Sequence, residues 1–363
     1  MSEGLQQETD TTPNSDIEID ENEITEFIES IKEAEYFDAS AMGPLTPASM
    51  YKAAIARLRA YKPPPFTVWD RLPLSRRAAV LILLFADRRG DLRVVITMRA
   101  ASLRNYSGHA AFPGGKADCL KETPWETARR EASEEIGLPL DDAKIPKPFR
   151  IEHLCQLPFS LARTALAVRP CVAFLHSDDN DGSSASSVEN SMMPRLDAKE
   201  VAAVFSAPFH NFLSPEDEVR DGETPPGSRS DWYNGQWIDW HEGKWRLHNF
   251  FVPINNQKVS KPKVREGGQA AIAEELDKEE EEGLTRYKVW GMTARMLVDA
   301  ARVAYGEDPT FEHNEHIGDE TMIVNLEKMG KLGEKVPGGP DLTEGDLRSA
   351  RAAEPAKDSS SKI

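Results

Sequence analysis

The chain has few cysteines and no long apolar run. Its three cysteines, Cys119, Cys155 and Cys171, are an odd number with no close pair. This usage argues against a disulfide framework and predicts a reducing compartment, with thiols packed in the core. The longest apolar run, Ala78 to Ala86, is far shorter than the ~20 residues that cross a bilayer, so we expect a buried strand there and no membrane partner. The first residues lack a basic or apolar leader, and no signal peptide is expected.

Positive charge is also scarce. Lysine and arginine number 44 against 61 acidic residues, which gives a net charge of −17 over 363 residues. This balance argues against nucleic acid or an anionic membrane as a partner. A small anionic substrate stays compatible with it, because bound metal ions and a few arginines can act locally. The hydrophobic content of 39% is enough for one sizeable domain.

What the chain does have is a cluster of acids at helical spacing. Glu131, Glu134 and Glu135 lie three and four residues apart, so a helix would bring their carboxylates close together. A divalent cation would relieve their repulsion. Oxygen ligands without histidine or cysteine favour Mg²⁺, Mn²⁺ or Ca²⁺ over zinc. The alternative is a solvated acidic helix face, and the well-specified ends of the helix weigh against it.

Both ends of this helix are marked in the sequence. Residues 123–126 read Thr-Pro-Trp-Glu, the pattern of a capping box with proline at the first helical position. Gly137 is a natural C-terminal stop. The apolar residues that recur every four positions predict the face that packs on the core, and they are Ala128, Ala132 and Ile136.

This segment resembles the Nudix box, in which a glycine and a glutamate precede Arg-Glu-apolar-x-Glu-Glu-x-Gly-apolar. The gap from Gly115 to Glu122 is one residue longer than in the general pattern, as is usual in the coenzyme A diphosphatase branch. The matching positions are Gly115, Glu122, Arg130, Glu131, Ala132, Glu134, Glu135, Gly137 and Leu138.

The residues just upstream resemble the signature of that branch. Residues 95–104 read Val-Ile-Thr-Met-Arg-Ala-Ala-Ser-Leu-Arg, and Gly108 and then Phe-Pro-Gly-Gly at 112–115 follow. Ala100 stands where the signature has serine, and the spacer before Arg104 is one residue shorter. The whole pattern covers about residues 77–305, and the long inserts and tails resemble the fungal peroxisomal type.

The resemblance implies a hydrolase that uses Mg²⁺ or Mn²⁺ to cleave the diphosphate of coenzyme A (CoA) or acyl-CoA. The implied products are adenosine 3′,5′-bisphosphate and 4′-phosphopantetheine or its acyl form. The general base stays open among Glu134, a metal-bound water and a distal acid such as Glu200. The implied metal ligands are Glu131, Glu134 and Glu135, and the implied catalytic residues are Glu134, Arg130 and Glu122, with Arg130 orienting the acids.

Substrate contacts are expected from the signature segment. Arg99 and Arg104 are candidates because the arginine fork matches phosphate oxygens, and Lys116 is a weaker candidate. Both arginines could instead be ordinary surface residues at a strand end. Gly114 and Gly115 permit a turn that other residues would strain. Core packing or an oligomer interface is the favoured interpretation of the tryptophan cluster, with adenine stacking as the alternative. Its members are Trp232, Trp237, Trp240 and Trp245.

Two other functions remain open from the sequence. The chain could hydrolyse another nucleoside diphosphate, such as NADH, or it could be a Nudix-like binding module without catalysis. The signature segment argues against the first. The second is disfavoured because the chain keeps all the acids of the box.

The order of elements predicts an α/β fold with a mixed sheet sandwiched between helices, as in the Nudix fold. We expect an acidic disordered segment at 1–36, the Nudix domain at 37–305 and a flexible tail at 306–363. Polar segments predict inserts near 177–195, 214–230 and 255–284. Helices are predicted over 47–61, 124–136 and 287–305, and strands over 78–85, 92–98, 150–157, 166–175, 200–205, 232–240 and 244–252.

The chain ends in Ser361-Lys362-Ile363, a conservative variant of the Ser-Lys-Leu peroxisomal address. It predicts the peroxisome as the location and an import receptor as a partner. If the tripeptide is there by chance, the cytoplasm is expected instead.

Overall fold

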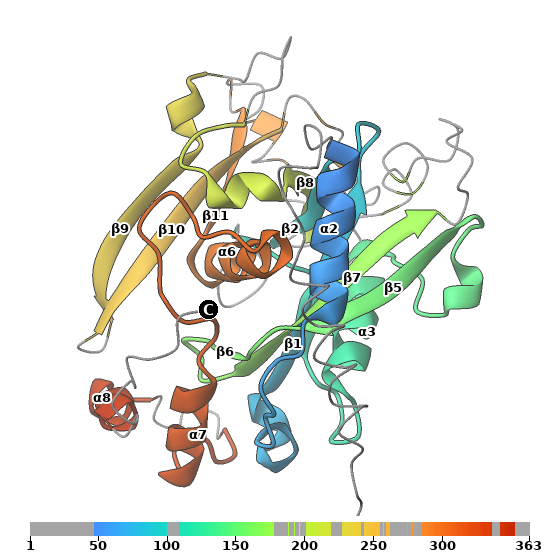
Figure 1. Ribbon diagram of the computed structural model, residues 1–363. Helices are drawn as coiled ribbons and strands as arrows, with labels where there is room; N and C mark the ends of the chain where they lie inside the picture. Colours follow the sequence, from blue (N-terminus) through green and yellow to red (C-terminus); the bar gives the residue numbers. More distant parts are fainter. Residues whose placement is uncertain are drawn as a thin grey trace, which may run out of the picture. The chain divides into compact units, whose positions relative to one another are not determined.

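The computed structural model of the chain describes residues of one compact unit, Thr46–Ile363 (Figure 1). The described residues are 47–99, 109–177, 201–218, 227–240, 243–254, 285–335 and 342–352, with scattered residues between 188 and 283. The acidic segment 1–36, Arg104, Glu200 and the C-terminal tripeptide lie outside them, as do most residues of the predicted inserts. None of the described helices has the length and apolar character needed to cross a membrane.

The larger sheet is mixed and has eight strands. Its main order is β3-β2-β1-β7-β5, with β4 also on β1, β6 on β7 and β8 on β2. The parallel pair β1 and β7 lies at its centre, and β2 pairs antiparallel with β1. The strands predicted up to residue 205 are confirmed to within three residues. The bounds are β1 (Arg77–Ala86), β2 (Leu92–Arg99), β3 (Ala110–Ala111), β4 (Gly114–Lys116), β5 (Phe149–Gln156), β6 (Ser160–Leu161), β7 (Ala167–Ser177) and β8 (Val201–Pro208).

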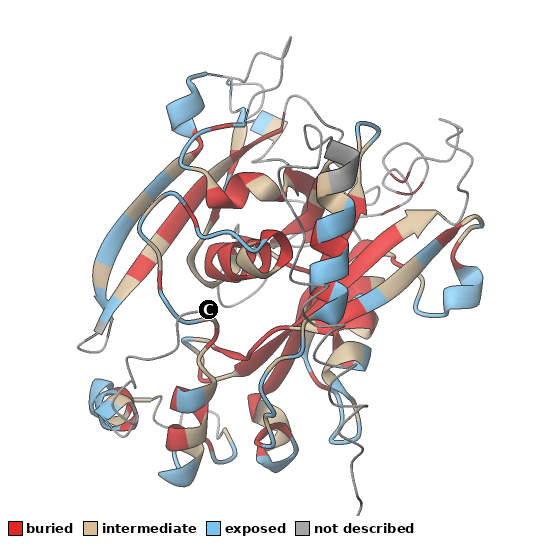
Figure 2. Cartoon of the chain, viewed as in Figure 1, coloured by how far each residue is buried: buried red, intermediate tan, exposed pale blue. Residues whose placement is uncertain are grey.

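Helices cover both faces of this sheet, and β1 shows why. Successive side chains of a strand point to opposite faces, and β1 is buried along almost its whole length (Figure 2). Leu81 and Leu83 pack in one cluster with α3 (Pro124–Ile136), whereas Ile82 and Leu84 pack in another with α2 (Pro47–Ala60) and α6 (Gly291–Tyr305). The predicted sandwich and the helices over 47–61 and 124–136 are therefore confirmed.

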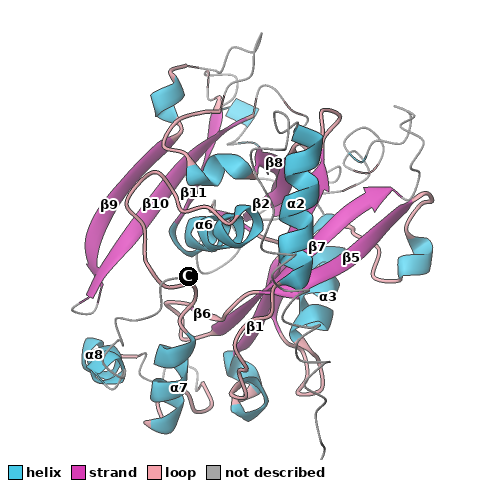
Figure 3. Ribbon diagram, in the orientation of Figure 1, coloured by secondary structure: helices cyan, strands magenta, loops and turns pink. Residues whose placement is uncertain are grey.

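A second, antiparallel sheet has the order β11-β10-β9 (Figure 3). It contains the predicted hairpin as β9 (Tyr233–Trp240) and β10 (Gly243–Pro253), followed by β11 (Arg286–Trp290). The prediction of a helix from residue 287 is wrong at its start. Tyr287 and Val289 are buried while Lys288 between them is exposed, the period-two pattern of a half-buried strand. Gly291, with φ 65°, makes the corner at which α6 begins.

The prediction of a flexible tail after residue 305 is wrong where the structure describes that segment. It forms α7 (Glu320–Lys328) and α8 (Glu344–Ala352), which bury apolar side chains in a third cluster with Trp69 and Phe159. Burial of this apolar surface is what holds the segment in place. The residues it contributes are Met322, Ile323, Leu326, Leu332, Leu347 and Ala350.

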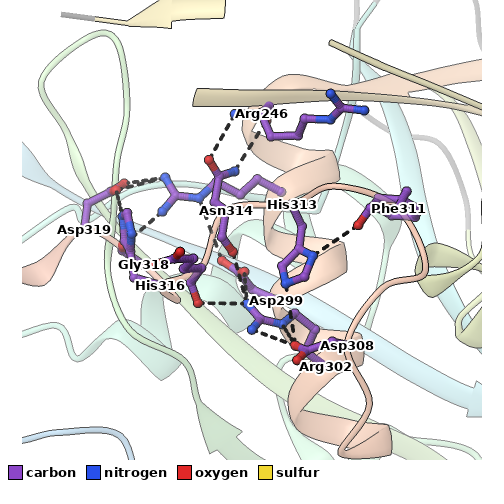
Figure 4. Close-up of polar contacts among 12 residues, drawn as sticks. Arg246, Asp299, Arg302, Asp308, Phe311, His313, Asn314, His316, Gly318 and Asp319 are labelled. Carbon is purple, nitrogen blue, oxygen red and sulfur yellow. Dashed lines mark hydrogen bonds and ion pairs between the residues drawn. The ribbon is translucent and has the colours of Figure 1, made fainter. Parts of the chain in front are cut away.

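Ion pairs hold the segment between α6 and α7 against α6 (Figure 4). Arg295 on α6 donates from Nη1 to Asp319 Oδ1 over 2.9 Å, and Gly318 O accepts from Nη2 over 2.9 Å. About two turns further along α6, Arg302 pairs with Asp308 over 2.8 Å. We refer to residues 306–319 as the return segment.

Candidate metal and active site

Helix α3 has the ends that its sequence predicts. Thr123 Oγ1 accepts from Glu126 N over 3.2 Å, and Glu126 Oε2 accepts from Thr123 N over 2.8 Å, so the capping box is complete. Gly137 ends the helix with φ 68°, a left-handed conformation that glycine adopts without strain. Ala132 and its apolar neighbours pack on β1 and β7. These contacts fix the register in which α3 presents its acids.

Arg130 lies at the centre of the acids. It donates to Glu122 Oε1 over 2.8 Å, to Glu131 Oε1 over 3.2 Å and to Glu134 Oε2 over 3.0 Å. Its fourth bond, to Lys116 O over 2.8 Å, ties α3 to the end of β4. Burial lowers the pKa of Arg130, but its bond to Glu122 and the charges of the nearby acids outweigh burial and raise the pKa. The contacts suit the orienting role, which stays a prediction.

Glu131 is half-buried beside Gly115. Burial raises the pKa of its carboxyl, Arg130 opposes that rise, and the charges of Glu134 and Asp118 add to it. A Cβ atom on Gly115 would lie 2.3 Å from Glu131 Oε1, closer than real Cβ contacts come. A side chain at position 115 would therefore have to displace the Glu131 carboxylate from its present place.

Glu135 is the most buried acid of α3, at 9% exposure. Its Oε2 accepts a hydrogen bond from the backbone N–H of Gly114 over 3.0 Å. Gly114 lies so close to β1 that a Cβ atom would come within 2.5 Å of Ala79 O. The two glycines at 114 and 115 thus bring β4 backbone and α3 carboxylates together, which is their role in the described structure.

Glu122 joins the cluster from the loop before α3. Its Oε1 pairs with Arg130, and its Oε2 accepts from the backbone N–H of Asp118 over 2.7 Å. Burial raises the pKa of Glu122, but these hydrogen bonds outweigh it and lower the pKa. Asp118 itself has a carboxylate oxygen 3.3 Å from Arg130 Nε, and sequence reasoning missed it. Only the path of the 116–122 loop brings it to Arg130, so no local pattern pointed to it.

The acids on and beside α3 can be compared, in arrangement and in chemistry, with the ligands of a divalent cation. No three acids among the described residues converge as a ready metal-ligand group, because Arg130 and the Gly114 N–H engage the predicted ligands. The chemistry of the donors nevertheless fits a hard ion. All are carboxylates, and the pKa of Glu131 is raised first by burial and then by the charges of Glu134 and Asp118, which a bound cation would offset.

Of the residues expected to contact the substrate, Arg99 and Lys116 are among the described residues. Arg99 ends β2, and its backbone N–H donates to His109 O over 3.0 Å. Lys116 is exposed at the end of β4, and its carbonyl accepts from Arg130. Arg104 lies outside the described residues. Trp232 is fully buried, which confirms core packing for that member of the tryptophan cluster.

The fold and the site together define an α/β sandwich with a capped, carboxylate-bearing helix beside a Gly-Gly strand. The sequence profile of the NUDIX domain matches residues 75–168, which include this helix. A protein of Saccharomyces cerevisiae, "Peroxisomal coenzyme A diphosphatase 1, peroxisomal", is 33% identical over 280 residues, 73% of this chain and 80% of that protein. The chain therefore belongs to the Nudix hydrolase family and is a hydrolase with the Nudix fold.

Other relatives are matched over smaller parts of their length. "Nudix hydrolase 15, mitochondrial" of Arabidopsis thaliana is 32% identical over 65% of this chain and 61% of its own. "Peroxisomal coenzyme A diphosphatase NUDT7" of Mus musculus is 33% identical over 39% of this chain and 51% of its own. Among solved structures, a C. elegans Ap4A hydrolase binary complex is 18% identical and covers 38% of this chain and 82% of its own, with a TM-score of 0.26.

Proposed function

We propose that this chain hydrolyses the diphosphate bond of coenzyme A or acyl-CoA in a divalent-metal-dependent reaction. The similarity to the S. cerevisiae protein carries the proposal, because it extends over 80% of a protein whose name states that activity. The signature segment before the box, with Arg99 and the Gly114-Gly115 pair, supports it. The products would be adenosine 3′,5′-bisphosphate and 4′-phosphopantetheine or its acyl form.

The residues of the site have distinct roles in this proposal. Nudix hydrolases generally need divalent metal ions, and Mg²⁺ or Mn²⁺ would neutralise phosphoryl oxygens and activate water. Glu131, Glu134 and Glu135 would hold the ions. Arg130 keeps the acids in place and balances their charge, and the Gly114 N–H orients Glu135. The protein then needs to supply little beyond positioning and charge.

A substrate panel tests the proposal. The purified chain is incubated with CoA, acyl-CoA, NADH, ADP-ribose and 8-oxo-dGTP, with and without Mn²⁺ or Mg²⁺, and products are separated chromatographically. CoA or acyl-CoA should give the highest kcat/KM, and EDTA should abolish turnover. If CoA ranks well below another diphosphate, the substrate assignment is wrong.

The variant Glu135→Gln tests the assignment of the metal site. Glutamine keeps an oxygen that can accept the Gly114 N–H, so the fold should be retained while the charge for a metal is lost. We expect kcat to fall about 100-fold or more, the upper range for disturbing a metal shell. The exposed acid Glu344 on α8 provides the control, and Glu344→Gln should leave kcat unchanged. Full activity in Glu135→Gln would contradict the metal-site assignment.

We also propose that the C-terminal Ser361-Lys362-Ile363 directs the chain to peroxisomes through the import receptor. Two of the relatives carry "peroxisomal" in their names, and the tripeptide differs from Ser-Lys-Leu only by one aliphatic side chain. A fluorescent protein fused in front of the whole chain should give punctate signal that coincides with a peroxisomal marker. A diffuse signal that does not change when the three residues are deleted would place the enzyme in the cytoplasm.

A further inference from the structure

A pocket of about 230 Å³ lies on the face of the second sheet that turns away from the core. Its position follows from strand parity. Phe250 and Val289 point to the opposite side and are fully buried, whereas their neighbours along β10 and β11 form the pocket. The residues that line it are Asn234, Gln236, Leu247, Asn249, Phe251, Lys288 and Trp290.

The lining combines one cation, two aromatic rings and three amides. Lys288 Nζ lies 5.2 Å from the ring centroid of Trp290 and 6.0 Å from that of Phe251. Within the ranges that the structure describes, no carboxylate lies at ion-pair distance from Lys288. Its partners there are π faces, which attract a cation without neutralising it. The lysine therefore offers its charge to an anion, and the rings offer stacking surface.

The pocket borders the signature segment. Trp290 meets the ring of His109 edge to face, with centroids 4.8 Å apart, and His109 O accepts from the backbone N–H of Arg99. Burial lowers the pKa of His109 first, and the positive charges of Lys288 and Arg99 lower it further. Two cations, Lys288 and Arg99, thus lie close enough to act on one imidazole in a chain of net charge −17.

The pocket is also within reach of the acids of α3. His109 precedes Gly114 by five residues, so the two backbones are at most about 18 Å apart. Gly114 in turn bonds Glu135. A substrate whose diphosphate lies at the acids could place one end in this pocket. The volume is below the roughly 300 Å³ of the smallest drug-sized sites, which suits one end of a ligand rather than all of it.

We propose that this pocket binds the nucleotide end of the substrate, a purine base stacked at Trp290 with a phosphomonoester paired to Lys288. Stacking and amide hydrogen bonds are what a purine needs, and the lysine supplies the charge that the phosphomonoester needs. The inference rests on the proposed function, in which the substrate is coenzyme A and its nucleotide is adenosine 3′-phosphate.

Binding measurements test the pocket without requiring turnover. The probe is adenosine 3′,5′-bisphosphate, titrated calorimetrically into the full chain, with adenosine 5′-monophosphate as the probe that lacks the 3′-phosphate. Lys288→Met should lower the affinity for the bisphosphate about tenfold, because one charge-assisted hydrogen bond is lost. The same variant should change the affinity for the monophosphate little. In CoA hydrolysis it should raise KM and leave kcat nearly unchanged.

Matched controls separate the outcomes. Lys244→Met removes an exposed lysine from the far end of β10, outside the pocket, and should bind the bisphosphate like the wild type. Trp290→Leu should lower the affinity for both probes. Because Trp290 directly precedes α6, the thermal unfolding of this variant is compared with that of the wild type. If the wild type fails to bind the bisphosphate, or if Lys288→Met binds it unchanged, the pocket assignment is overturned even if CoA is hydrolysed. Lys288-dependent binding without CoA hydrolysis would overturn only the proposed function.

Discussion

At the scale of single residues, the contact between Gly115 and Glu131 predicts the effect of a substitution on turnover. An added Cβ would lie 2.3 Å from Glu131 Oε1 and 2.5 Å from its Cδ, so Gly115→Ala must displace that carboxylate. We expect kcat to fall at least about tenfold, since a 1 Å misplacement in a site can cost ~10²-fold. The control is Gly333→Ala, where no heavy atom lies within 4 Å of the added Cβ. Equal activity in both variants would show that the position of Glu131 does not matter for turnover.

His210 predicts how stability depends on pH. Its ring lies between two acids, with Nδ1 2.6 Å from Glu218 Oε1 and Nε2 3.2 Å from Glu307 Oε2. The bond to Glu218 outweighs burial and raises the pKa of His210 in the folded chain. A raised folded pKa means that protonation stabilises the fold below the unfolded pKa of about 6.5, and that this stability is lost as pH rises through the folded pKa.

The measurement is urea unfolding at pH 6 and at pH 8.5. Wild-type stability should decrease between the two, and His210→Gln should reduce that decrease. The same pH slope in both proteins would show that another group is responsible.

Most of the residues around the acids could be predicted from the sequence. The others could not, because they are close to the acids only in the folded chain. The capping box, Gly137 and the spacing of the acids are local, so the pattern contains them. Asp118 and the carbonyl of Lys116 reach Arg130 only because a loop and a strand fold beside α3. Lys288 and Trp290 come from a different sheet, more than 150 residues later, and their alternation was hidden inside a segment that reads as one amphipathic helix.

At the scale of elements, the strands of the larger sheet were the most predictable. Runs such as β1 are apolar after their first residue, here Arg77, and turn residues follow them. The helices after residue 305 were missed for a physical reason. Each has nine residues, too short to be stable alone, and depends on Trp69 and Phe159 from distant loops to cover its apolar side. The pattern of apolar residues in so short a helix is too brief to predict it from the sequence.

The return segment provides a test at this scale. The side chains of Arg295 and Asp319 are 6% and 11% exposed, and Asp319 Oδ2 also accepts from the backbone N–H of Leu161 over 2.9 Å. Asp319→Asn would leave the buried Arg295 guanidinium with only Asp299, 3.9 Å away, as a charged partner among the described residues. We expect a loss of about 3 kcal/mol in the free energy of unfolding, the lower end of the range for breaking a buried pair.

The matched control is Asp308→Asn on the same segment. Asp308 pairs with Arg302 but is 70% exposed, so its removal should cost about 0–1 kcal/mol. Urea unfolding curves measure both variants. A loss in Asp319→Asn no larger than that in Asp308→Asn would show that the return segment does not depend on the buried pair.

At the scale of the whole molecule, the two sheets and the helices after residue 305 share contacts with the elements that hold the site. α6 packs on the larger sheet, Thr293 at its start donates to Ala110 O over 3.2 Å, and Ala110 lies four residues before Gly114. The return segment is bonded to the same helix through Arg295. Stability measured on the whole chain should therefore respond to what binds at the acids.

A metal that binds the acids of the folded chain but not the unfolded chain should stabilise the whole molecule. At a free concentration one hundred times its Kd, the gain is about 2.7 kcal/mol. For a domain of this size that corresponds to roughly 5–10 °C in Tm. Burial is the main cause of the raised pKa of Glu131, and a cation bound there would offset the repulsion from Glu134 and Asp118 that adds to it.

Differential scanning fluorimetry with increasing Mg²⁺ or Mn²⁺ measures this gain. KCl at the same ionic strength serves as the control, because general screening of the acidic surface also changes Tm. Glu131→Gln should remove most of the metal-dependent rise, whereas Glu344→Gln should keep it. If neither ion raises the Tm of the wild type above the KCl control, or if Glu131→Gln gains as much as the wild type, the metal does not bind where α3 gathers its acids.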